Sequence, residues 1–589
     1  MYNFESLGII RNVTNFQNFK GGYYFMKKSK LVWLLSLVLV LSVFLAACGG
    51  KDKDETKGTD NNTEKTNKPD AKQELNLMET AEIPTADSAL VTDAVGFTVL
   101  NNVNEGLYRL NKDNVAEPAI AEGEPKVNED GTVYTFTLRD AKWSDGSAVT
   151  ANDFEFAWKR AIDPKTGSEY GPYMMNGVIK NAEKISTGKA KPDTLGVKAV
   201  DEKTLEVTLE KPVPYFLSLM AFGTFLPQKE EFVKEKGKQY AKNSDNLLYN
   251  GPFVLSDWDG TGLTWKYKKN ENYWDKDNVK LDTINVDVVK ETSTAVNLYN
   301  SGEKDRAGLS GEFAAQYAND KNLVKTEEAS VFYLKLNQKR GGKTDTPLAN
   351  VNIRKAIAQA FNKEELTKNV LANGSEPANY LVPKNFTFDE NKKDFRDVNG
   401  DMNKFDATAA KDSWEKGLKE LGVKKVELEF LGDDSDLAKK MDEYMKNQLE
   451  KNLPGLSIKL KEVPFQNRID LDTKQDYDIQ FAGWGPDYQD PLTFISLWTS
   501  DSAQNKMSYN SKEYDKLVKD ANVTYANDPA KRWQALADAE KLVVGTDAAI
   551  APVYQRTRIA LQQPYVKDLV IHNFGADYSY KWAYIAGKE

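Results

Sequence analysis

The chain has 589 residues and a formal net charge of −9, which makes it too long for one hydrophobic core and too acidic to favour nucleic acid as a partner. The single cysteine, Cys48, excludes a disulfide within the chain. From the length we expect two or three lobes. The single histidine, His572, leaves histidine-based catalytic triads and zinc sites short of partners, so we expect no enzymatic activity, no metal and no cofactor.

The N-terminal segment has the three parts of a secretory signal. Lysines at positions 27, 28 and 30 precede an apolar run over 31–44, and the small residues Ala46 and Ala47 then lead to Cys48. The ending Leu-Ala-Ala-Cys resembles the lipobox of bacterial lipoproteins, which implies a signal peptide over 26–47 and lipidation of Cys48. A membrane-spanning helix is the weaker alternative, because the apolar run is short for a bilayer.

Two segments beside this signal are expected to lie outside the fold. Residues 1–25 fit a signal poorly, and Lys20-Gly21-Gly22 could be the translation of a ribosome-binding site, so we expect synthesis to start at Met26 and 1–25 to be a mis-assigned start. Residues 48–73 are polar and nearly free of apolar side chains, which predicts a lipid anchor followed by a flexible linker.

Strands and helices alternate in the body of the chain. Apolar residues at every second position predict a strand over 131–138, and Thr150 with an acidic residue three positions later predicts a helix start. A hairpin is predicted over 197–209. The pattern over 426–463 is strand, helix and strand, which implies a parallel strand pair and hence an α/β sheet in the C-terminal half.

A partial calcium-loop pattern occurs at Asp397-Val-Asn399-Gly400. Asp406 stands at the distal position of this pattern, but the first ligand position is Phe395, which cannot bind a cation through an oxygen side chain. A loop of ordinary turn residues explains the pattern as well, so both interpretations stay open.

One segment, residues 477–494, combines a strand, two glycines and a carboxylate. The strand is predicted to end near Gly483, and Asp490 as N-cap with Pro491 at the first helical position predicts a following helix. Between them, Gly483 and Gly485 lack Cβ atoms and so allow another backbone to approach, while Trp484 supplies a rigid wall and Asp487 a negative charge. The simpler alternative is a strand-to-helix turn with a packed tryptophan.

This segment resembles the ligand-gripping segment of oligopeptide-binding proteins, the extracytoplasmic receptors of peptide ABC importers. Further stretches that resemble the family extend over nearly the whole body from about residue 74. They are 101–110, 118–122, 138–146, 150–154, 250–253, 272–275 and 352–357.

The resemblance implies an α/β fold in which two lobes with mixed sheets form a clamshell, joined by hinge crossovers and carrying an extra third domain. Lobe I would take 74–104, 228–335 and 553–589, the extra domain II 105–227, and lobe III 336–552. The crossovers near Lys335 and Pro552 would form the hinge, and ligand would close the lobes over itself.

The same resemblance implies the ligand contacts, residue by residue. Asp487 matches the carboxylate that pairs with the α-ammonium of a peptide, and Gly483 and Gly485, with Trp484 between them, match backbone positions that hydrogen-bond it as an added strand. Tyr170 matches a tyrosine that reaches in from the extra domain. The N-terminal backbone contact matches Ala94 and Val95. Near Phe481 and Asp472 the family's basic residues are absent, so a fixed grip on the peptide carboxyl terminus is not implied.

The function implied is capture of short peptides with a free N-terminus and their delivery to the membrane permease of an ABC importer. Cys48 would hold the receptor, expected to be a monomer, on the outer face of the cell membrane of a Gram-positive bacterium. Alternatives are capture of nickel, heme or a sugar on the same fold, a peptide-pheromone receptor, and an enzyme or structural surface protein. Asp487 favours peptides over sugars, because a sugar offers no ammonium.

Overall fold

The computed structural model describes residues 68–213, 215–526 and 528–588. The predicted signal peptide, Cys48 and most of the predicted linker therefore lie outside the described residues. Across these described ranges, no helix is both long enough and apolar enough to cross a membrane.

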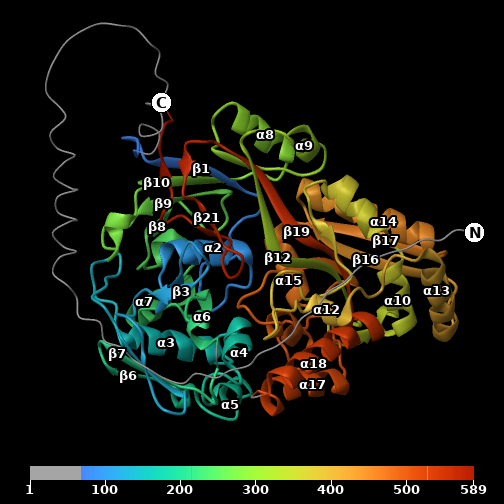
Figure 1. Cartoon of the computed structure of the whole chain (residues 1–589), viewed down its shortest axis with the longest axis horizontal. Helices are drawn as coiled ribbons and strands as arrows, with labels where there is room; N and C mark the ends of the chain where they lie inside the picture. Colours follow the sequence, from blue (N-terminus) through green and yellow to red (C-terminus); the bar gives the residue numbers. More distant parts are fainter. Residues whose placement is uncertain (1–67, 214, 527, 589) are drawn as a thin grey trace, which may run out of the picture. The chain divides into compact units, whose positions relative to one another are not determined.

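A four-stranded sheet is built from the N-terminal strand and the middle of the chain (Figure 1). Its order is β1 (Glu74–Glu79), β10 (Thr283–Val288), β9 (Thr264–Lys269) and β8 (Phe253–Ser256). β1 runs parallel to β10, and the other pairs are antiparallel. The helices in the stretches predicted for lobe I are α2 (Ala94–Val103), α7 (Glu230–Lys236), α8 (Thr292–Asn300) and α9 (Gly311–Gln316).

A second four-stranded sheet forms within the range predicted for domain II. Its order is β4 (Lys126–Val127), β5 (Val133–Thr137), β7 (Thr204–Thr208) and β6 (Val197–Asp201), and β2 (Tyr108–Leu110) pairs with β3 (Ala116–Pro118). The predicted strand and hairpin are thus confirmed. Thr150 and Asp153 form the predicted capping box at the start of α3 (Ala151–Ile162), whose Phe154 and Trp158 are fully buried. The other helices here are α4 (Tyr170–Met175), α5 (Ala182–Ser186) and α6 (Phe216–Leu219).

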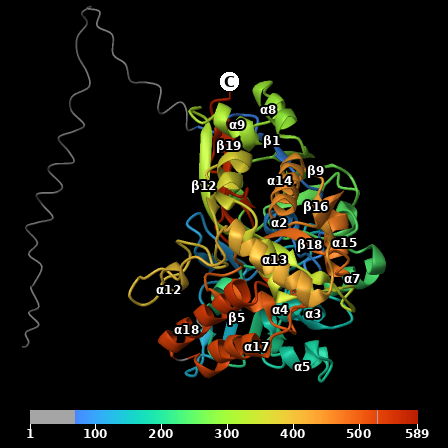
Figure 2. The ribbon, with the colours of Figure 1, turned by 90° about the vertical axis from the view of Figure 1, so that its right-hand side faces the viewer.

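A seven-stranded sheet is crossed by two long strands, β12 (Leu323–Leu336) and β19 (Ile550–Gln562), which run side by side in Figures 1 and 2. Its order is β11 (Arg306–Gly308), β19, β12, β18 (Ile479–Trp484), β16 (Val426–Asp433) and β17 (Leu456–Val463), with β15 (Glu376–Pro377) paired to β19. β16 and β17 are parallel and joined by α14 (Asp436–Asn452), which confirms the predicted β-α-β unit.

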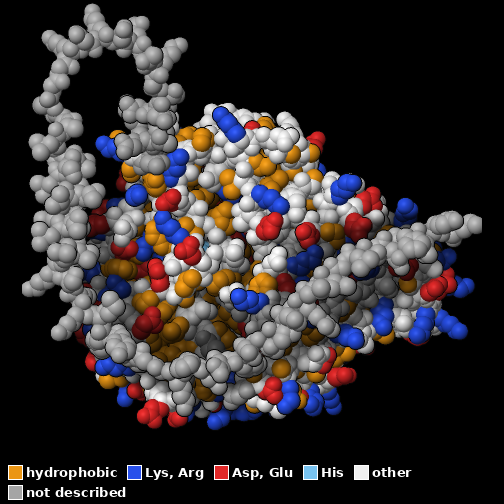
Figure 3. All heavy atoms as spheres, in the orientation of Figure 1, with side chains coloured by type: hydrophobic (Ala, Val, Ile, Leu, Met, Phe, Trp, Pro, Cys, Tyr) orange, Lys and Arg blue, Asp and Glu red, His pale blue; other side chains and the backbone are white. Residues whose placement is uncertain are grey.

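Helices complete the C-terminal half of the described chain. They are α10 (Val351–Gln359), α11 (Lys363–Glu365), α12 (Arg396–Asn399), α13 (Ala407–Leu421), α15 (Phe465–Thr473), α16 (Leu492–Ile495), α17 (Lys512–Lys519) and α18 (Pro529–Glu540). Short strand pairs are β13 (Lys339–Arg340) with β14 (Thr344–Asp345), β20 (Val566–Lys567) with β23 (Tyr584–Ile585), and β21 (Val570–Ile571) with β22 (Tyr578–Ser579). On the face drawn in Figure 3, acidic and basic side chains are interspersed.

The helix after the glycine segment starts one residue later than predicted. Pro491, not Asp490, occupies the N-cap of α16, and α16 is only four residues long. The Asp490 side chain still accepts from the N–H of Leu492 at 2.9 Å, but it also forms an ion pair with Arg532 of α18 at 2.8 Å. This long-range partner fixes the aspartate, which sequence spacing could not show.

The partial calcium loop is used for internal packing. The side-chain amide of Asn399 donates to the carbonyl of Ala537 at 2.7 Å and to Glu540 at 3.0 Å. Among the described residues, no group of three or more carboxylate, histidine or cysteine side chains is arranged to hold a metal. Residues Arg396–Asn399 form the short helix α12, and Asp406 caps α13 by accepting from the N–H of Thr408 at 3.0 Å.

Candidate functional site

A cavity of about 600 Å³ is lined by residues from all three predicted parts of the body. Its volume lies in the range typical of sites for small ligands. All seven residues that the sequence singled out for ligand contact line this one cavity. They are Ala94, Val95, Tyr170, Gly483, Trp484, Gly485 and Asp487.

The edge of β18 is open where it lines the cavity. β12 pairs with β18 along its whole length, whereas β16 pairs only with Ile479 and Gln480. The N–H of Asn337 donates to the carbonyl of Asp478 at 2.9 Å, so residues of even number in this strand direct their N–H and C=O groups to β12. Phe481 and Gly483 therefore direct theirs to the unpaired edge, and Gly485 continues the same alternation.

Gly483 and Gly485 are glycines for different structural reasons. A Cβ at Gly483 would lie 2.6 Å from the ring of Phe332, so this glycine makes room for internal packing and not only for a ligand. A Cβ at Gly485 would lie 3.1 Å from the hydroxyl oxygen of Ser330, a much milder contact. Both glycines are solvent-exposed, so their main-chain groups remain accessible from the cavity.

Trp484 packs against the segment that was predicted to form domain II. Its ring stacks on Tyr170 with the ring centroids 6.1 Å apart and meets Tyr173 edge-on at 6.0 Å. Tyr170 opens α4, and Ala94 and Val95 form the first turn of α2, so three separate segments come together around this wall. The predicted role of Trp484 as a rigid wall is consistent with these contacts.

Asp487 is a buried carboxylate without a partner cation. The residue is only 6% exposed, and its Oδ2 atom has no hydrogen-bond partner. Its main-chain N–H donates to the Thr493 hydroxyl at 3.0 Å, which fixes the backbone. No ion pair joins it to any lysine, arginine or histidine in the described part of the chain. Burial raises the pKa of Asp487 from 3.8 to about 8.

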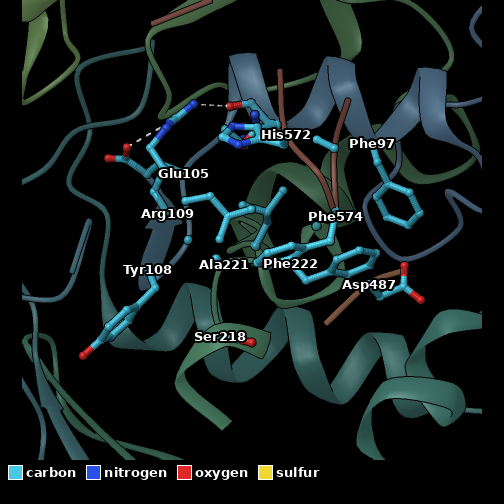
Figure 4. A pocket seen from close by; sticks show the side chains of 18 residues that line it. Phe97, Glu105, Tyr108, Arg109, Ser218, Ala221, Phe222, Asp487, His572 and Phe574 are labelled. Carbon is cyan, nitrogen blue, oxygen red and sulfur yellow. Dashed lines mark hydrogen bonds and ion pairs between the residues drawn. The ribbon is translucent and has the colours of Figure 1, made fainter. Parts of the chain in front are cut away.

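A second, smaller pocket of about 30 Å³ meets the cavity at Asp487 (Figure 4). The rings of Phe97, Phe222 and Phe574 line it, and this apolar surrounding explains why the carboxylate loses hydration. His572 lies farther along the same pocket, with Nδ1 2.9 Å from the side-chain oxygen of Asn114. Burial lowers the pKa of His572 to about 4, so the ring is neutral and supplies no charge to Asp487.

Basic residues do enter the cavity, although the sequence comparison near Phe481 and Asp472 showed none. Lys335 of β12 lies 2.5 Å from Asp472, and Lys506 lies 3.6 Å from the same carboxylate. Arg468 of α15 lines the cavity as well. Lys335 and Lys506 come from distant parts of the chain, so no local motif around Asp472 could have revealed them, whereas Arg468 precedes Asp472 by one helical turn on α15 and was within reach of a local search.

Comparison with known proteins identifies the family. Residues 115–506 match the family described as bacterial extracellular solute-binding proteins, family 5 (middle region), and the chain belongs to this family of binding proteins. A dipeptide-binding protein of Lactococcus lactis subsp. cremoris is 34% identical over 574 residues, which cover 95% of this chain and 100% of that protein.

Solved structures agree with this assignment. OppA of Listeria monocytogenes bound to peptide is 51% identical, with a TM-score of 0.85 over 88% of this chain and 100% of that chain. The pheromone receptor PrgZ is 39% identical, with a TM-score of 0.83 over the same shares. These similarities confirm the predicted fold class, a two-lobed mixed α/β binding protein.

Proposed function

We propose that the protein is a lipid-anchored extracytoplasmic receptor that captures short peptides with a free amino terminus for the permease of an ABC importer. The main support is the carboxylate of Asp487, which is buried beside an open strand edge with no cation of its own. An α-ammonium group would supply the missing positive charge. A peptide-bound relative, OppA of Listeria monocytogenes, favours peptide as the ligand.

In this proposal the peptide adds a strand to the free edge of β18. With its ammonium group at Asp487, the peptide runs back past Gly485, Gly483 and Phe481, antiparallel to β18. Main-chain hydrogen bonds then supply affinity that depends little on sequence, as in other cases of strand addition. Wide, hydrated side-chain pockets would keep selectivity modest at most positions.

Peptides with single N-methylated bonds test this pairing. Each N-methyl group removes one donor, and one lost hydrogen bond of about 1–1.5 kcal/mol weakens binding roughly tenfold. We expect large losses at alternating peptide bonds and small losses at the bonds between them, measured by isothermal titration calorimetry. Equal losses at every bond would contradict strand pairing, while absence of binding by the unmethylated peptides would contradict the peptide-receptor function.

The proposal includes two lobes that close over the peptide. Lobe I would comprise 74–104, 228–335 and 553–589, with 105–227 as domain II and 336–552 as lobe III. The hinge would lie where β12 passes Lys335 and β19 passes Pro552. Small-angle X-ray scattering should report a smaller radius of gyration when peptide is added, and an unchanged radius would contradict closure.

The lipid anchor is placed at Cys48, outside the described residues. A polar linker between anchor and body would let the body turn freely above the membrane. Cys48→Ala should move the protein from the membrane fraction to the medium without changing peptide affinity. Retention of this variant on membranes with no lipid attached would contradict the anchor.

Signalling by a peptide pheromone is the second candidate, and the similarity to the receptor PrgZ is the observation that favours it. A nutrient receptor should bind a mixed library of short peptides with a modest spread of affinities. Native mass spectrometry of such a library distinguishes the two functions, because a dedicated receptor would retain one sequence and leave the others unbound. The same measurement with nickel, heme and cellobiose tests the other solutes.

A further inference from the structure

The ring of Phe332 covers Gly483 on one face of the seven-stranded sheet. Phe332 of β12 lies directly opposite Gly483 of β18, and a Cβ at Gly483 would lie 2.6 to 2.7 Å from three atoms of this ring. The ring therefore occupies the space that a side chain at position 483 would fill. Because β16 pairs only with Ile479 and Gln480, no strand follows β18 beside Gly483. The ring of Phe332 thus extends from β12 towards the open edge of β18.

Phe332 belongs to a cluster of three stacked rings, which we call the ring cluster, together with Phe481 and Tyr554. The ring centroids of Phe332 and Tyr554 are 4.8 Å apart, and those of Phe332 and Phe481 are 5.9 Å apart. Tyr554 is 3% exposed and Phe481 9% exposed, whereas Phe332 is only half-buried. All three residues line the cavity. Phe332 therefore presents accessible apolar surface to the cavity and is supported by two buried rings.

The start of α14 extends this apolar surface. Leu437 and Met441 lie one helical turn apart on α14, and both line the cavity. Met441 is buried, but Leu437 is half-buried and packs against the same hydrophobic core as Phe332. Two large apolar side chains thus keep part of their surface open to the cavity. An apolar group of a ligand that covers them would remove this surface from water, which is favourable.

Two charged groups beside this apolar surface are paired within the protein. Arg556 lies over the ring of Phe332, with its Cζ atom 5.0 Å from the ring centroid, and its Nε donates to Glu328. Asp434, three residues before Leu437, forms an ion pair with Lys290 at 2.6 Å. Neither group therefore depends on a charged side chain of the ligand for its partner.

Strand pairing assigns one peptide side chain to the ring cluster. Residues directly opposite each other in an antiparallel pair have their side chains on the same face of the sheet. A peptide residue opposite Gly483 would therefore direct its side chain to the face of Phe332, and it would meet the ring directly because Gly483 has no side chain. With the residue that carries the ammonium group opposite Gly485, two positions before Asp487, the residue opposite Gly483 is the third of the peptide.

We propose that this apolar surface is a subsite for an aromatic or large aliphatic side chain at the third position of the bound peptide. The residues of the subsite are Phe332, Leu437, Met441, Phe481 and Tyr554. The inference rests on the proposed peptide-receptor function, and it narrows the ligand class to short peptides with an apolar third residue. Burial of apolar surface adds affinity at this position, and a ring gains further from packing against Phe332.

The first peptide position would face the same side of the sheet but different chemistry. A side chain directed from Gly485 to this face meets the hydroxyl oxygen of Ser330, which would lie 3.1 Å from a Cβ at Gly485. A small polar group offers a peptide side chain little apolar surface to cover. The preference for an apolar side chain should therefore be larger at the third position than at the first.

Substitution along a neutral peptide tests the subsite. The parent is alanine tetrapeptide with a free amino terminus and an amidated carboxyl terminus. Phenylalanine, leucine and glutamine are placed in turn at each position, and dissociation constants are measured by titration calorimetry. At the third position we expect phenylalanine to bind at least about tenfold more tightly than glutamine, with leucine between them. The phenylalanine-to-glutamine ratio of affinities should be smaller at the other three positions.

Two variants assign the preference to the subsite. Phe332→Ala removes the accessible ring, and Leu437→Ala shortens the half-buried side chain on α14. Each should reduce the phenylalanine-to-glutamine ratio at the third position severalfold. Leu460→Ala is the matched control and should leave the ratio unchanged, because Leu460 is also half-buried against the same core but does not line the cavity. Thermal unfolding checks each fold, and Leu437→Ala decides the test if Phe332→Ala does not fold.

The outcomes separate this inference from the proposed function. If the alanine parent binds and the third position shows no preference for phenylalanine, or another position shows a larger one, the inference is wrong while the receptor function stands. A preference that persists undiminished in the folded variants would also overturn it. If neither the parent nor any substituted peptide binds, the peptide-receptor function itself is wrong.

Discussion

Two buried carboxylates in the same half of the molecule have opposite surroundings. Glu540 of α18 is fully buried and accepts from the N–H groups of Leu381 and Val382 at 3.0 and 2.9 Å, and it forms an ion pair with Arg396. Asp487 is almost as deeply buried, yet its Oδ2 atom has no partner.

The difference between Glu540 and Asp487 distinguishes a buried carboxylate that stabilises the fold from one that is free to bind a ligand. Burying an unpaired charge is costly, and a protein that satisfies Glu540 so fully can build a counter-ion where one is needed. We propose that Asp487 is left unpaired so that its carboxylate can pair with a positive charge on the ligand. Strongly shifted pKa values that arise from desolvation inside a cavity are typical of functional sites.

Asp487→Asn should produce the largest effect on binding. Removing one member of a buried ion pair typically costs about 3–5 kcal/mol, which corresponds to roughly two to three and a half decades in dissociation constant. Titration calorimetry with a free peptide measures this loss. Asp434→Asn is the control, because Asp434 also lines the cavity but is paired with Lys290 at 2.6 Å. Similar losses in both variants would contradict a special role for Asp487.

Glu540→Gln should affect stability instead of binding. It leaves Arg396 buried without its counter-ion, so we expect the free energy of unfolding to fall by about 3–5 kcal/mol. Urea denaturation measures the change. The exposed pair of Lys112 and Asp568 gives the control, and Asp568→Asn should cost less than about 1 kcal/mol. A folded Glu540→Gln protein with weakened peptide binding would contradict the assignment of Glu540 to stability alone.

The pH dependence of stability should report the unpaired state of Asp487. The pKa is about 8 in the folded, empty protein and 3.8 in an unperturbed aspartate, so the folded state binds the proton more tightly. Wild type should lose stability relative to Asp487→Asn as pH rises from about 4 to about 8, with no further change above that. Denaturation of protein freed of ligand between pH 4 and 9 tests this. If wild type instead gained stability relative to Asp487→Asn as pH rises, the prediction would be contradicted.

The two glycines offer the smallest and most local test. Gly483→Ala places a methyl group against Phe332, and overpacking of this kind costs about 1–3 kcal/mol of stability. Gly485→Ala meets only the Ser330 hydroxyl and should be nearly neutral for stability. Thermal unfolding of the two variants, compared side by side, distinguishes them. Equal destabilisation would show that Phe332 does not determine the glycine at 483.

Local patterns predicted the local structure well. The β-α-β unit over 426–463 and the capping box at Thr150 follow from hydrophobic spacing and from side chains close in sequence, which is where such rules apply. The start of α16 was predicted one residue early, because the pairing of Asp490 with Arg532 depends on a residue 42 positions away.

The candidate site was only partly predictable. The seven contact residues came from resemblance to a family, and they do line one cavity. The pairing of Lys335 with Asp472 spans 137 positions of sequence, so no spacing rule could reveal it.

The most direct test of the account compares one peptide with a free amino terminus and the same peptide acetylated there. If the charge of Asp487 is reserved for an α-ammonium group, acetylation should weaken binding to wild type by roughly two decades or more. The acetylated peptide should then bind wild type about as poorly as the free peptide binds Asp487→Asn. Undiminished affinity of the acetylated peptide for wild type would show that Asp487 does not bind an amino terminus.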